Sequence, residues 1–482
     1  MLFNSFDFAI FLPIVFMLYW FVANNKLRLQ NFLIVLASYV FYGWWDWRFL
    51  SLILFSTLVD YLVGRRLEEE EKQTTRKVLL CTSILVNLGF LAFFKYYNFF
   101  LDNFITSFSF FGVGITPNSL NIILPVGISF YTFQTLSYSI DVYKRKLKPT
   151  KDFIAFSAFV SFFPQLVAGP IERAENLLPQ FYKNRIFDYN KAVDGMRQIL
   201  WGLFKKMVIA DNAAEIANQI FNNSNDYSGS TLLLGALFFT FQIYGDFSGY
   251  SDIAIGTARL FGFDLMRNFN FPYFSRDIAE FWRRWHISLS TWFRDYLYIP
   301  IGGSRGSSWM KVRNIFIIFI VSGFWHGANW TFIIWGALNA IYFLPLLLTQ
   351  KNRTNLGIVA QGRYLPTIKE SFQMLSTFGL TVLAWIFFRA ESIGHSMSII
   401  SKIFSQSLIS LPAFEGKRYA LETLLLIIFF LAVEWNGREE QYAIAQLGNN
   451  WKRPVRYAMY YSIFIALFWF GGKEQQFIYF QF

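Results

Sequence analysis

The chain has 482 residues, of which 55% are hydrophobic, 21% aromatic and only 15% charged. A soluble domain carries about 25% charged residues, so this composition cannot cover the surface of a water-soluble protein of this size. It also excludes a disordered chain, a coiled coil and a disulfide-stabilised secreted scaffold. We therefore predict a polytopic membrane protein.

The charge balance is basic, with 43 Lys and Arg against 31 Asp and Glu, a net charge of +12. In a membrane protein such an excess belongs to cytoplasmic loops beside anionic lipid headgroups. No soluble basic domain is present, so we expect the lipid bilayer and no nucleic acid as a partner. The single cysteine, Cys81, excludes an intrachain disulfide, and we expect it to be buried. The whole chain has only this cysteine and three histidines, too few for a zinc or iron–sulfur ligand cluster, so we predict no metal site.

The first third of the chain contains five apolar stretches, each about 20 residues long and able to cross a bilayer. They lie near 6–23, 30–46, 49–63, 78–100 and 121–140. The first has no positive n-region and no cleavage site, so we interpret it as a retained span.

Basic residues between these stretches alternate with a loop that has none. Lys26 and Arg28 follow the first stretch, and 64–77 and 144–151 are rich in Lys and Arg, whereas 102–120 contains neither. The positive-inside rule therefore places the basic segments in the cytoplasm and both the N-terminus and 102–120 outside.

Further apolar stretches lie near 152–169, 231–250, 312–325, 330–348, 374–389, 419–435 and 457–471. Segments 191–220 and 275–300 mix charged and apolar residues at helical spacing, which is typical of interfacial or re-entrant helices. We expect an all-α polytopic integral membrane protein with about ten to twelve spans. No internal repeat or linker divides it, so we predict one domain over 1–482, with its catalytic core near 240–340.

Polar groups inside apolar stretches are costly in a bilayer and usually functional, and here they concentrate between 240 and 335. The first cluster runs from Gln242 to Asp252 and includes Asp246 and Tyr250. On a helix its two carboxylates differ by about 120° in azimuth, which argues against a joint acid–base pair. Two interpretations stay open: a polar lining for a substrate cavity, or hydrogen bonding between helices with one Asp paired to an Arg.

The second cluster spans 281–295, where Trp282, Trp285, Leu289 and Trp292 recur at helical spacing. Three cations in it could bind a cytosolic polyanion or simply anchor to headgroups, and the pattern alone favours headgroups. They are Arg283, Arg284 and Arg294. A glycine-rich turn with Arg305 follows, and it matches no phosphate-binding fingerprint.

The third cluster centres on His326, which interrupts an apolar stretch from Ile315 to Leu348. An imidazole with a pKa near 6.5 suits proton transfer at neutral pH. A lone histidine is ordinarily structural, but one within a membrane stretch, between Gly323 and Gly327, favours function. His395 is expected at a helix start, with a structural role.

Taken together, the runs 281–290, 296–303 and 324–336 resemble the membrane-bound O-acyltransferase family. The segments 167–173 and 245–252 are similar to its bacterial branch of alginate O-acetylation and teichoic-acid D-alanyl transfer proteins. The resemblance extends roughly from Phe41 to the aromatic tail 477–482. It implies a helical membrane domain with a tunnel from a cytoplasmic donor pocket to an outer acceptor funnel.

The resemblance also implies the roles of the site residues. His326 matches the catalytic histidine of the family, and His286 matches a second polar position, where we expect an assisting role. It implies acetyl-CoA as a co-substrate rather than a tightly bound cofactor, with a periplasmic or extracellular acetyltransferase partner and a polysaccharide acceptor. The expected place is the inner membrane of a bacterium.

The chemistry of acyl transfer supports these roles. Transfer from a thioester to a hydroxyl needs a base, which His326 supplies, and a donor for the oxyanion. Candidates for the hydrogen-bond donor to the oxyanion and for other substrate contacts are Trp325, Asn329, Trp330 and protonated His286. Candidates for binding the CoA phosphates are Arg283, Arg284, Arg294 and Arg305. We favour direct transfer over an acyl-histidine intermediate. Transfer of D-alanine or another acyl group to a cell-wall polymer, a non-catalytic transporter and a structural scaffold for an export complex stay open as alternatives.

Overall fold

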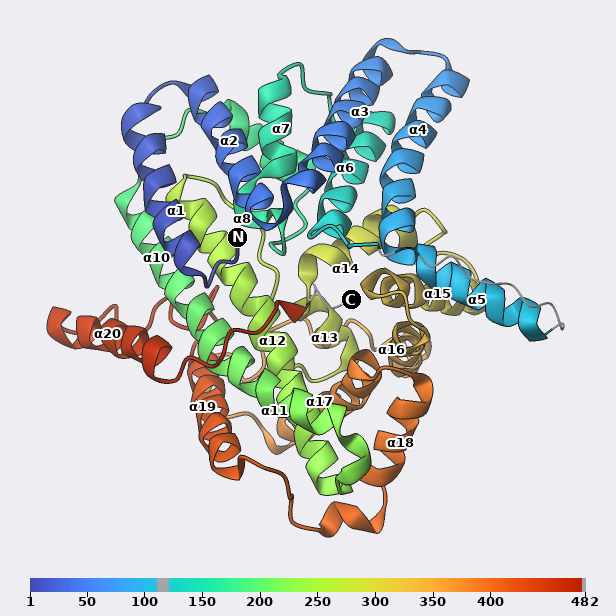
Figure 1. The fold of residues 1–482 in the computed structure, drawn as a ribbon, viewed down its shortest axis with the longest axis vertical. Coiled ribbons are helices and arrows are strands. Elements are labelled where there is room, and N and C mark those ends of the chain that lie inside the picture. Colours follow the sequence, from blue (N-terminus) through green and yellow to red (C-terminus); the bar gives the residue numbers. More distant parts are fainter. Residues whose placement is uncertain (111–119, 121, 479–482) are drawn as a thin grey trace. The chain divides into compact units, whose positions relative to one another are not determined.

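The computed structural model describes residues 1–110, 120 and 122–478, and these residues form helices and no strands (Figure 1). Every predicted span overlaps a helix, and the stretch near 121–140 is helical from Ile128 on. Among the described residues, six helical stretches are long and apolar enough to cross a membrane, and two shorter apolar ones are Phe6–Val22 and Phe153–Leu166. The chain is thus an all-helical membrane protein, whereas the total of ten to twelve spans and the tunnel stay predictions.

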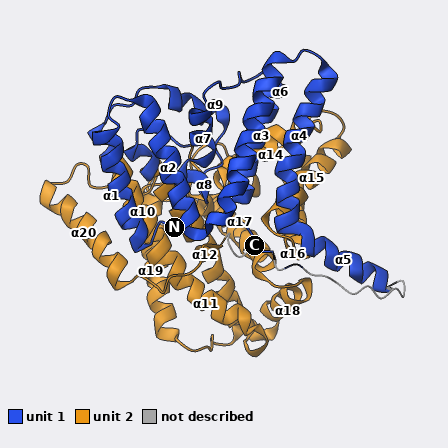
Figure 2. Cartoon of the chain, turned by 45° about the horizontal axis from the view of Figure 1, so that its top comes forward, with its two compact units in different colours: residues 1–192, 257–265 blue, residues 193–256, 266–482 orange. Residues whose placement is uncertain are grey.

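The described chain divides into two compact units, coloured separately in Figure 2. Unit 1 comprises 1–192 and 257–265, and unit 2 comprises 193–256 and 266–482. The single domain expected from the sequence stays a prediction.

Unit 1 is built from apolar helices joined by basic turns. Its elements are α1 (Phe6–Met17), η1 (Leu18–Val22), α2 (Leu27–Asp46), η2 (Trp47–Phe49), α3 (Leu50–Glu69), α4 (Gln73–Leu91), η3 (Ala92–Tyr96), α5 (Tyr97–Phe110), α6 (Ile128–Tyr143), α7 (Phe153–Ser161), α8 (Phe163–Leu166), α9 (Ala174–Leu177) and η4 (Leu178–Tyr182). The stretch Leu27–Glu69 is about twice as long as a bilayer span requires. It breaks at Asp46, whose carboxylate accepts a hydrogen bond from the backbone N–H of Arg48.

A buried polar network holds three helices of unit 1 together. Helices α3, α4 and α6 pack against one another (Figure 1). The fully buried carboxylate of Asp60 on α3 accepts hydrogen bonds from Ser83 and Asn87 on α4 and from Ser139 on α6. Apolar surface alone does not select helix partners in lipid, so such hydrogen bonds fix which helices meet.

Two expectations about unit 1 were wrong. Residues 102–110 belong to helix α5 instead of a loop, and 111–119 and 121 lie outside the described residues. Cys81 is exposed on α4, because that helix turns its polar Ser83 and Asn87 inward and leaves the cysteine on the other face.

Unit 2 carries the polar clusters. Helices α10 (Tyr189–Leu203) and α12 (Gly229–Leu260) have residues in both units. The remaining elements are η5 (Phe204–Ala210), α11 (Asp211–Asn222), η6 (Ser224–Asp226), η7 (Pro272–Phe274), α13 (Ile278–Arg284), α14 (Ile287–Phe293), η8 (Arg294–Tyr298), α15 (Ser308–His326), α16 (Trp330–Leu348), α17 (Ile368–Arg389), α18 (Ile393–Ile403), η9 (Gln406–Ile409), α19 (Lys417–Asn436) and α20 (Arg453–Trp469).

Segment 191–220 forms one continuous helical run through α10, η5 and α11. Most of its residues from 204 to 217 are buried, so an interfacial position does not describe this part of the segment. Lys205 and Lys206 in this part have carboxylate partners inside unit 2, which is why a charged sequence can lie in a protein interior. His395 is the third residue of α18, as expected for a helix start.

Candidate active site

Helices α15 and α16 form a tight hairpin that fixes His326. A Cβ atom on Gly323 would lie 2.2 Å from the backbone oxygen of Phe332, and one on Gly336 would lie 2.3 Å from that of Phe319. Only glycine permits such close contact between the helix backbones. The hairpin therefore ends α15 at His326 and begins α16 at Trp330, so the histidine lies at the turn.

The imidazole of His326 is surrounded by aromatic rings. Its centroid lies 4.9 Å from that of Trp325, 5.1 Å from that of Trp335 and 5.2 Å from that of Phe388, with each ring approaching edge-on. The side chain is 4% exposed. Aromatic packing of this kind fixes the orientation of the ring and lowers the dielectric around it.

His286 lies in the turn between α13 and α14 and has an unusual backbone. Its φ angle is +43°, in the left-handed region that a non-glycine residue rarely adopts. Such a conformation persists only where surrounding contacts hold it, and it is frequent at functional sites.

The contacts that hold His286 come from Asn268, which is fully buried. The backbone oxygen of Asn268 accepts from the N–H of Ile287 at 2.8 Å. Its side-chain oxygen accepts from the backbone N–H of Ser288 at 3.2 Å and from the Ser288 hydroxyl at 2.9 Å. Its amide nitrogen donates to Ser251 Oγ on α12 at 3.1 Å. Asn268 therefore ties the His286 turn to α12.

This arrangement fixes the tautomer of His286. Its Nδ1 lies 3.1 Å from Asn268 Oδ1. Because that atom accepts from the Ser288 N–H, it is an oxygen, and His286 Nδ1 must carry the hydrogen that it receives. In the neutral ring Nε2 is then the basic atom.

Trp325 connects the two histidines. Its ring centroid lies 6.2 Å from that of His286 and 4.9 Å from that of His326, edge-on to both. Phe247 of α12 packs edge-on against His286 at 4.5 Å. The structure thus brings together His286, His326 and Trp325, three residues predicted from the sequence.

Asn329 and Trp330, which were expected at the same site, have other surroundings. The side chain of Asn329 caps α16 by accepting from the N–H of Thr331, and it donates to the backbone oxygen of Glu391. Trp330 is 51% exposed. Their expected contacts with substrate stay predictions.

The carboxylates of the first cluster are engaged in buried ion pairs. Asp246 lies 2.8 Å from the ammonium group of Lys206, which also binds Asp211, and it accepts from the backbone N–H of Ile478. Asp252 pairs with Lys205 at 2.5 Å. One of the two interpretations from the sequence paired an aspartate of this cluster with an arginine. That partner was wrong, because both aspartates pair with lysines of η5.

Tyr250 is also buried, and its ring centroid lies 4.7 Å from that of Phe477 in the C-terminal segment. Residues 479–482 of the aromatic tail lie outside the described residues.

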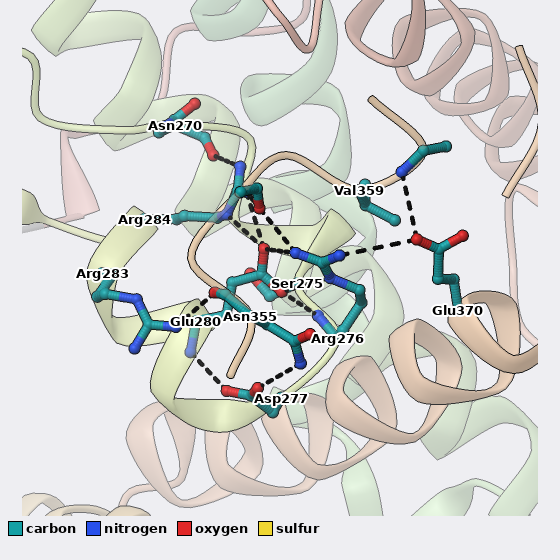
Figure 3. A network of polar contacts seen from close by, with 12 residues as sticks. Asn270, Ser275, Arg276, Asp277, Glu280, Arg283, Arg284, Asn355, Val359 and Glu370 are labelled. Atoms are coloured by element: carbon teal, nitrogen blue, oxygen red, sulfur yellow. Dashed lines mark hydrogen bonds and ion pairs between the residues drawn. The ribbon is translucent and has the colours of Figure 1, made fainter. Parts of the chain in front are cut away.

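Two of the predicted phosphate-binding arginines take part in a network around α13 (Figure 3). Arg284 is buried and binds Glu280 at 2.8 Å, and Glu280 also binds Arg276. Arg283 donates to the backbone oxygens of Asn352 and Asn355. Both arginines hold the segment after α16 against α13, so they contribute to the framework beside the His286 turn.

Arg294 and Arg305 are exposed, and Arg294 pairs with the neighbouring Asp295 at 2.7 Å. These two remain accessible to a ligand. A role for any of the four arginines in binding CoA stays a prediction.

Sequence reasoning missed Asn268, Lys205 and Lys206. The pair Lys205-Lys206 inside the apolar run 199–210 was a readable signal, because a charge there needs a partner. Asn268 stands in an ordinary polar segment, Arg267-Asn268-Phe269-Asn270, which gives no such signal.

The chain is thus a helical, multi-pass membrane protein that holds two buried histidines against one tryptophan. The family model of "MBOAT, membrane-bound O-acyltransferase family" matches residues 48–383. The chain belongs to this family, and it is an acyltransferase.

Its curated relatives carry related names. The "Probable alginate O-acetylase AlgI" of Pseudomonas aeruginosa is 42% identical over 82% of this chain and 73% of its own length. The protein of the same name from Pseudomonas putida is 37% identical over 98% of both chains. The "Peptidoglycan O-acetyltransferase" of Helicobacter pylori is 33% identical over 100% of this chain and 98% of its own length.

Proposed function

We propose that this protein transfers an acetyl group from a cytoplasmic thioester across the membrane, for the O-acetylation of a polysaccharide outside it. The observation that carries the proposal is the pair His286 and His326, both buried and both next to the indole ring of Trp325. The relatives are named as an alginate O-acetylase and a peptidoglycan O-acetyltransferase. These names support acetyl as the transferred group and a polymer as the acceptor.

The chemistry assigns His326 as the general base. The acceptor oxygen attacks the thioester carbonyl carbon and its proton passes to His326. The tetrahedral intermediate then collapses, the carbon–sulfur bond breaks, and the leaving thiolate takes up the proton from the imidazolium. A base in this position contributes about 10²–10⁴ to the rate. The single cysteine, Cys81, is far from His326 in the sequence, which argues against an acyl-enzyme linked through a cysteine. We therefore propose direct transfer to the acceptor.

Acetyl-CoA is the proposed donor, reaching the site through a tunnel from the cytoplasm. A periplasmic or extracellular acetyltransferase partner would receive the group and complete its transfer to the polymer. This places the protein in the bacterial inner membrane, with exposed Arg294 and Arg305 available for the donor phosphates.

The proposal is tested with the full chain in phospholipid vesicles that receive acetyl-CoA labelled in its acetyl group and, as hydroxyl acceptors, alginate and peptidoglycan fragments. We expect release of free CoA in wild type and its loss in His326→Ala. His395→Ala is the matched control, because that histidine lies on α18 beside Ser224, outside the site.

Equal release of CoA by His326→Ala and by wild type, at equal protein abundance, would contradict the catalytic role. A parallel assay with a D-alanyl carrier protein separates the donors: turnover of that donor alone would replace acetyl by D-alanyl. Transport of intact labelled donor without free CoA would replace the enzyme by a transporter.

A further inference from the structure

Unit 1 contains a cavity of about 500 Å³ that the acyl-transfer site does not use. It lies among the segment after α9, the loop before α10 and the turn after α12. We call it the Arg185 pocket, after its buried cation, and it is lined by Trp20, Gln180, Lys183, Arg185, Lys191 and Arg259 among others.

Arg185 is a buried cation whose partners are neutral. Its side chain is 7% exposed, and the guanidinium donates to Asn31 Oδ1 at 2.6 Å and to the backbone oxygen of Gln180 at 3.3 Å. The rings of Tyr19 and Phe263 lie over it, at 5.6 and 4.8 Å. Among the described residues no carboxylate lies within ion-pair distance of it, and its Nε–H has no acceptor.

A buried charge without a counter-ion is unfavourable. Burial lowers the pKa of Arg185, which shows that its surroundings oppose the positive charge. Replacing water around an ion costs several kcal/mol unless an opposite charge compensates. An anion that enters the pocket beside the guanidinium group would supply that compensation.

The rest of the pocket is also cationic. Four basic residues line it against two acidic ones, Asp188 and Asp264. Asp264 is paired with Lys191 at 2.7 Å, and Asp188 accepts from the backbone N–H groups at the start of α10. Both carboxylates are therefore engaged, which leaves the positive potential of Arg185 and Lys183 facing the cavity.

The rim of the pocket is apolar and exposed. Ile186 is 85% exposed, and Phe187, which also lines the cavity, is 43% exposed. Lys26 and Arg28, shortly after Trp20 in the chain, belong to the side that the positive-inside rule assigns to the cytoplasm. A cationic hollow bordered by exposed apolar side chains at a membrane surface fits an amphiphile with an anionic head.

We propose that the Arg185 pocket binds a phosphate group, and that an anionic phospholipid of the cytoplasmic leaflet carries it. The phosphate oxygens accept from Arg185 and Lys183, and the acyl chains lie along Ile186 and Phe187. This site is separate from acyl transfer, so it holds whether or not the proposed donor and acceptor are right.

The experiment titrates the full chain, in a neutral detergent, with phosphatidylglycerol and measures the bound lipid by native mass spectrometry. Phosphatidylcholine and inorganic phosphate are run in parallel. We expect one retained phosphatidylglycerol per chain, with Arg185→Gln weakening its affinity at least about tenfold, because a charge-assisted hydrogen bond is lost.

Lys183→Glu is the second variant, since Lys183 is exposed and its replacement leaves the packing around Arg185 intact. Lys146→Glu is its matched control, an exposed lysine in the basic loop after α6 that does not line the pocket. We expect Lys183→Glu to weaken phosphatidylglycerol binding several-fold more than Lys146→Glu does, even if Arg185→Gln fails to fold.

Retention of phosphatidylglycerol and phosphatidylcholine to the same extent would overturn the proposal. So would equal weakening of binding by the two lysine variants. Binding of inorganic phosphate, lost in Lys183→Glu, with no retained phosphatidylglycerol would keep a phosphate site and overturn the lipid as its source.

Discussion

The two histidines of the site are held in different ways. His286 is fixed by hydrogen bonds, because Asn268 determines both its turn and its tautomer. His326 is fixed by packing, between Trp325, Trp335 and Phe388 at the end of a glycine-packed hairpin. The basic atom of His286 is thus defined by a polar partner, whereas aromatic rings fix the orientation of His326.

The difference separates two kinds of defect. Damage to the polar support of His286 should change proton transfer and its pH dependence, whereas damage to the hairpin should change the stability of the fold around His326.

Replacing each histidine by alanine should show how much each contributes to the rate of acetyl transfer. We expect His326→Ala to lower the rate of acetyl transfer by about 10²–10⁴, because the base is lost. His286→Ala should lower it less, and His395→Ala should leave it unchanged. The measurement is CoA release per mole of protein in vesicles. A greater loss in His286→Ala than in His326→Ala would exchange the roles of base and assistant.

The second prediction concerns Asn268, whose role is to position His286. Asn268→Leu removes the acceptor for His286 Nδ1 and leaves buried donors unpaired, which costs about 1–3 kcal/mol, or about 5- to 150-fold in rate. Asn268→Asp keeps an acceptor at the same place, so it should retain more activity.

The pH profile distinguishes positioning from mere structure. A carboxylate next to His286 raises its pKa, so in Asn268→Asp the ring loses its proton at higher pH. The limb of the rate profile that reports His286 should therefore move to higher pH. A purely structural role for Asn268 predicts a different outcome. Both variants would then lower protein abundance equally, and the pH profile of the rate would not move in the enzyme that remains.

The third prediction tests the hairpin that carries His326. Gly323→Ala places a methyl group against the backbone oxygen of Phe332, so we expect a loss of stability of about 1–3 kcal/mol. Gly379→Ala on α17 is the matched control, because nothing lies within 4 Å of its added Cβ. Thermal unfolding of the detergent-solubilised protein measures both. Equal midpoints for the two variants would show that the close packing at Gly323 is dispensable.

The smallest expected effect is that of Ser251→Ala. It removes the acceptor for the amide nitrogen of Asn268 but leaves the oxygen that binds His286 in place. The net loss should be about 0.5–1.5 kcal/mol, or about two- to tenfold in rate. The same CoA assay measures it. An effect larger than that of Asn268→Leu would mean that Ser251 acts on the site by another route.

The sequence predicted the helices of this protein well. Each predicted span overlaps a helix in the structure, because length and apolar composition are local properties. It also drew attention to His326, because a polar group in an apolar stretch stands out by itself, whereas the family resemblance pointed to His286; the roles of both stay predictions. It failed at Cys81 and at 102–110, where the outcome depended on which face of a helix turned inward and on how far α5 continued.

What the sequence alone determined is the class of the molecule, a helical membrane protein with histidines in its apolar core. Only the tertiary structure decided which nitrogen of His286 is basic and that Asp246 and Asp252 neutralise lysines. Only it showed that Arg185 lacks a counter-ion among the described residues. The physical reason is that the length of an apolar stretch depends only on residues that are neighbours in the chain. Hydrogen bonds and ion pairs join atoms from segments that are far apart in the sequence.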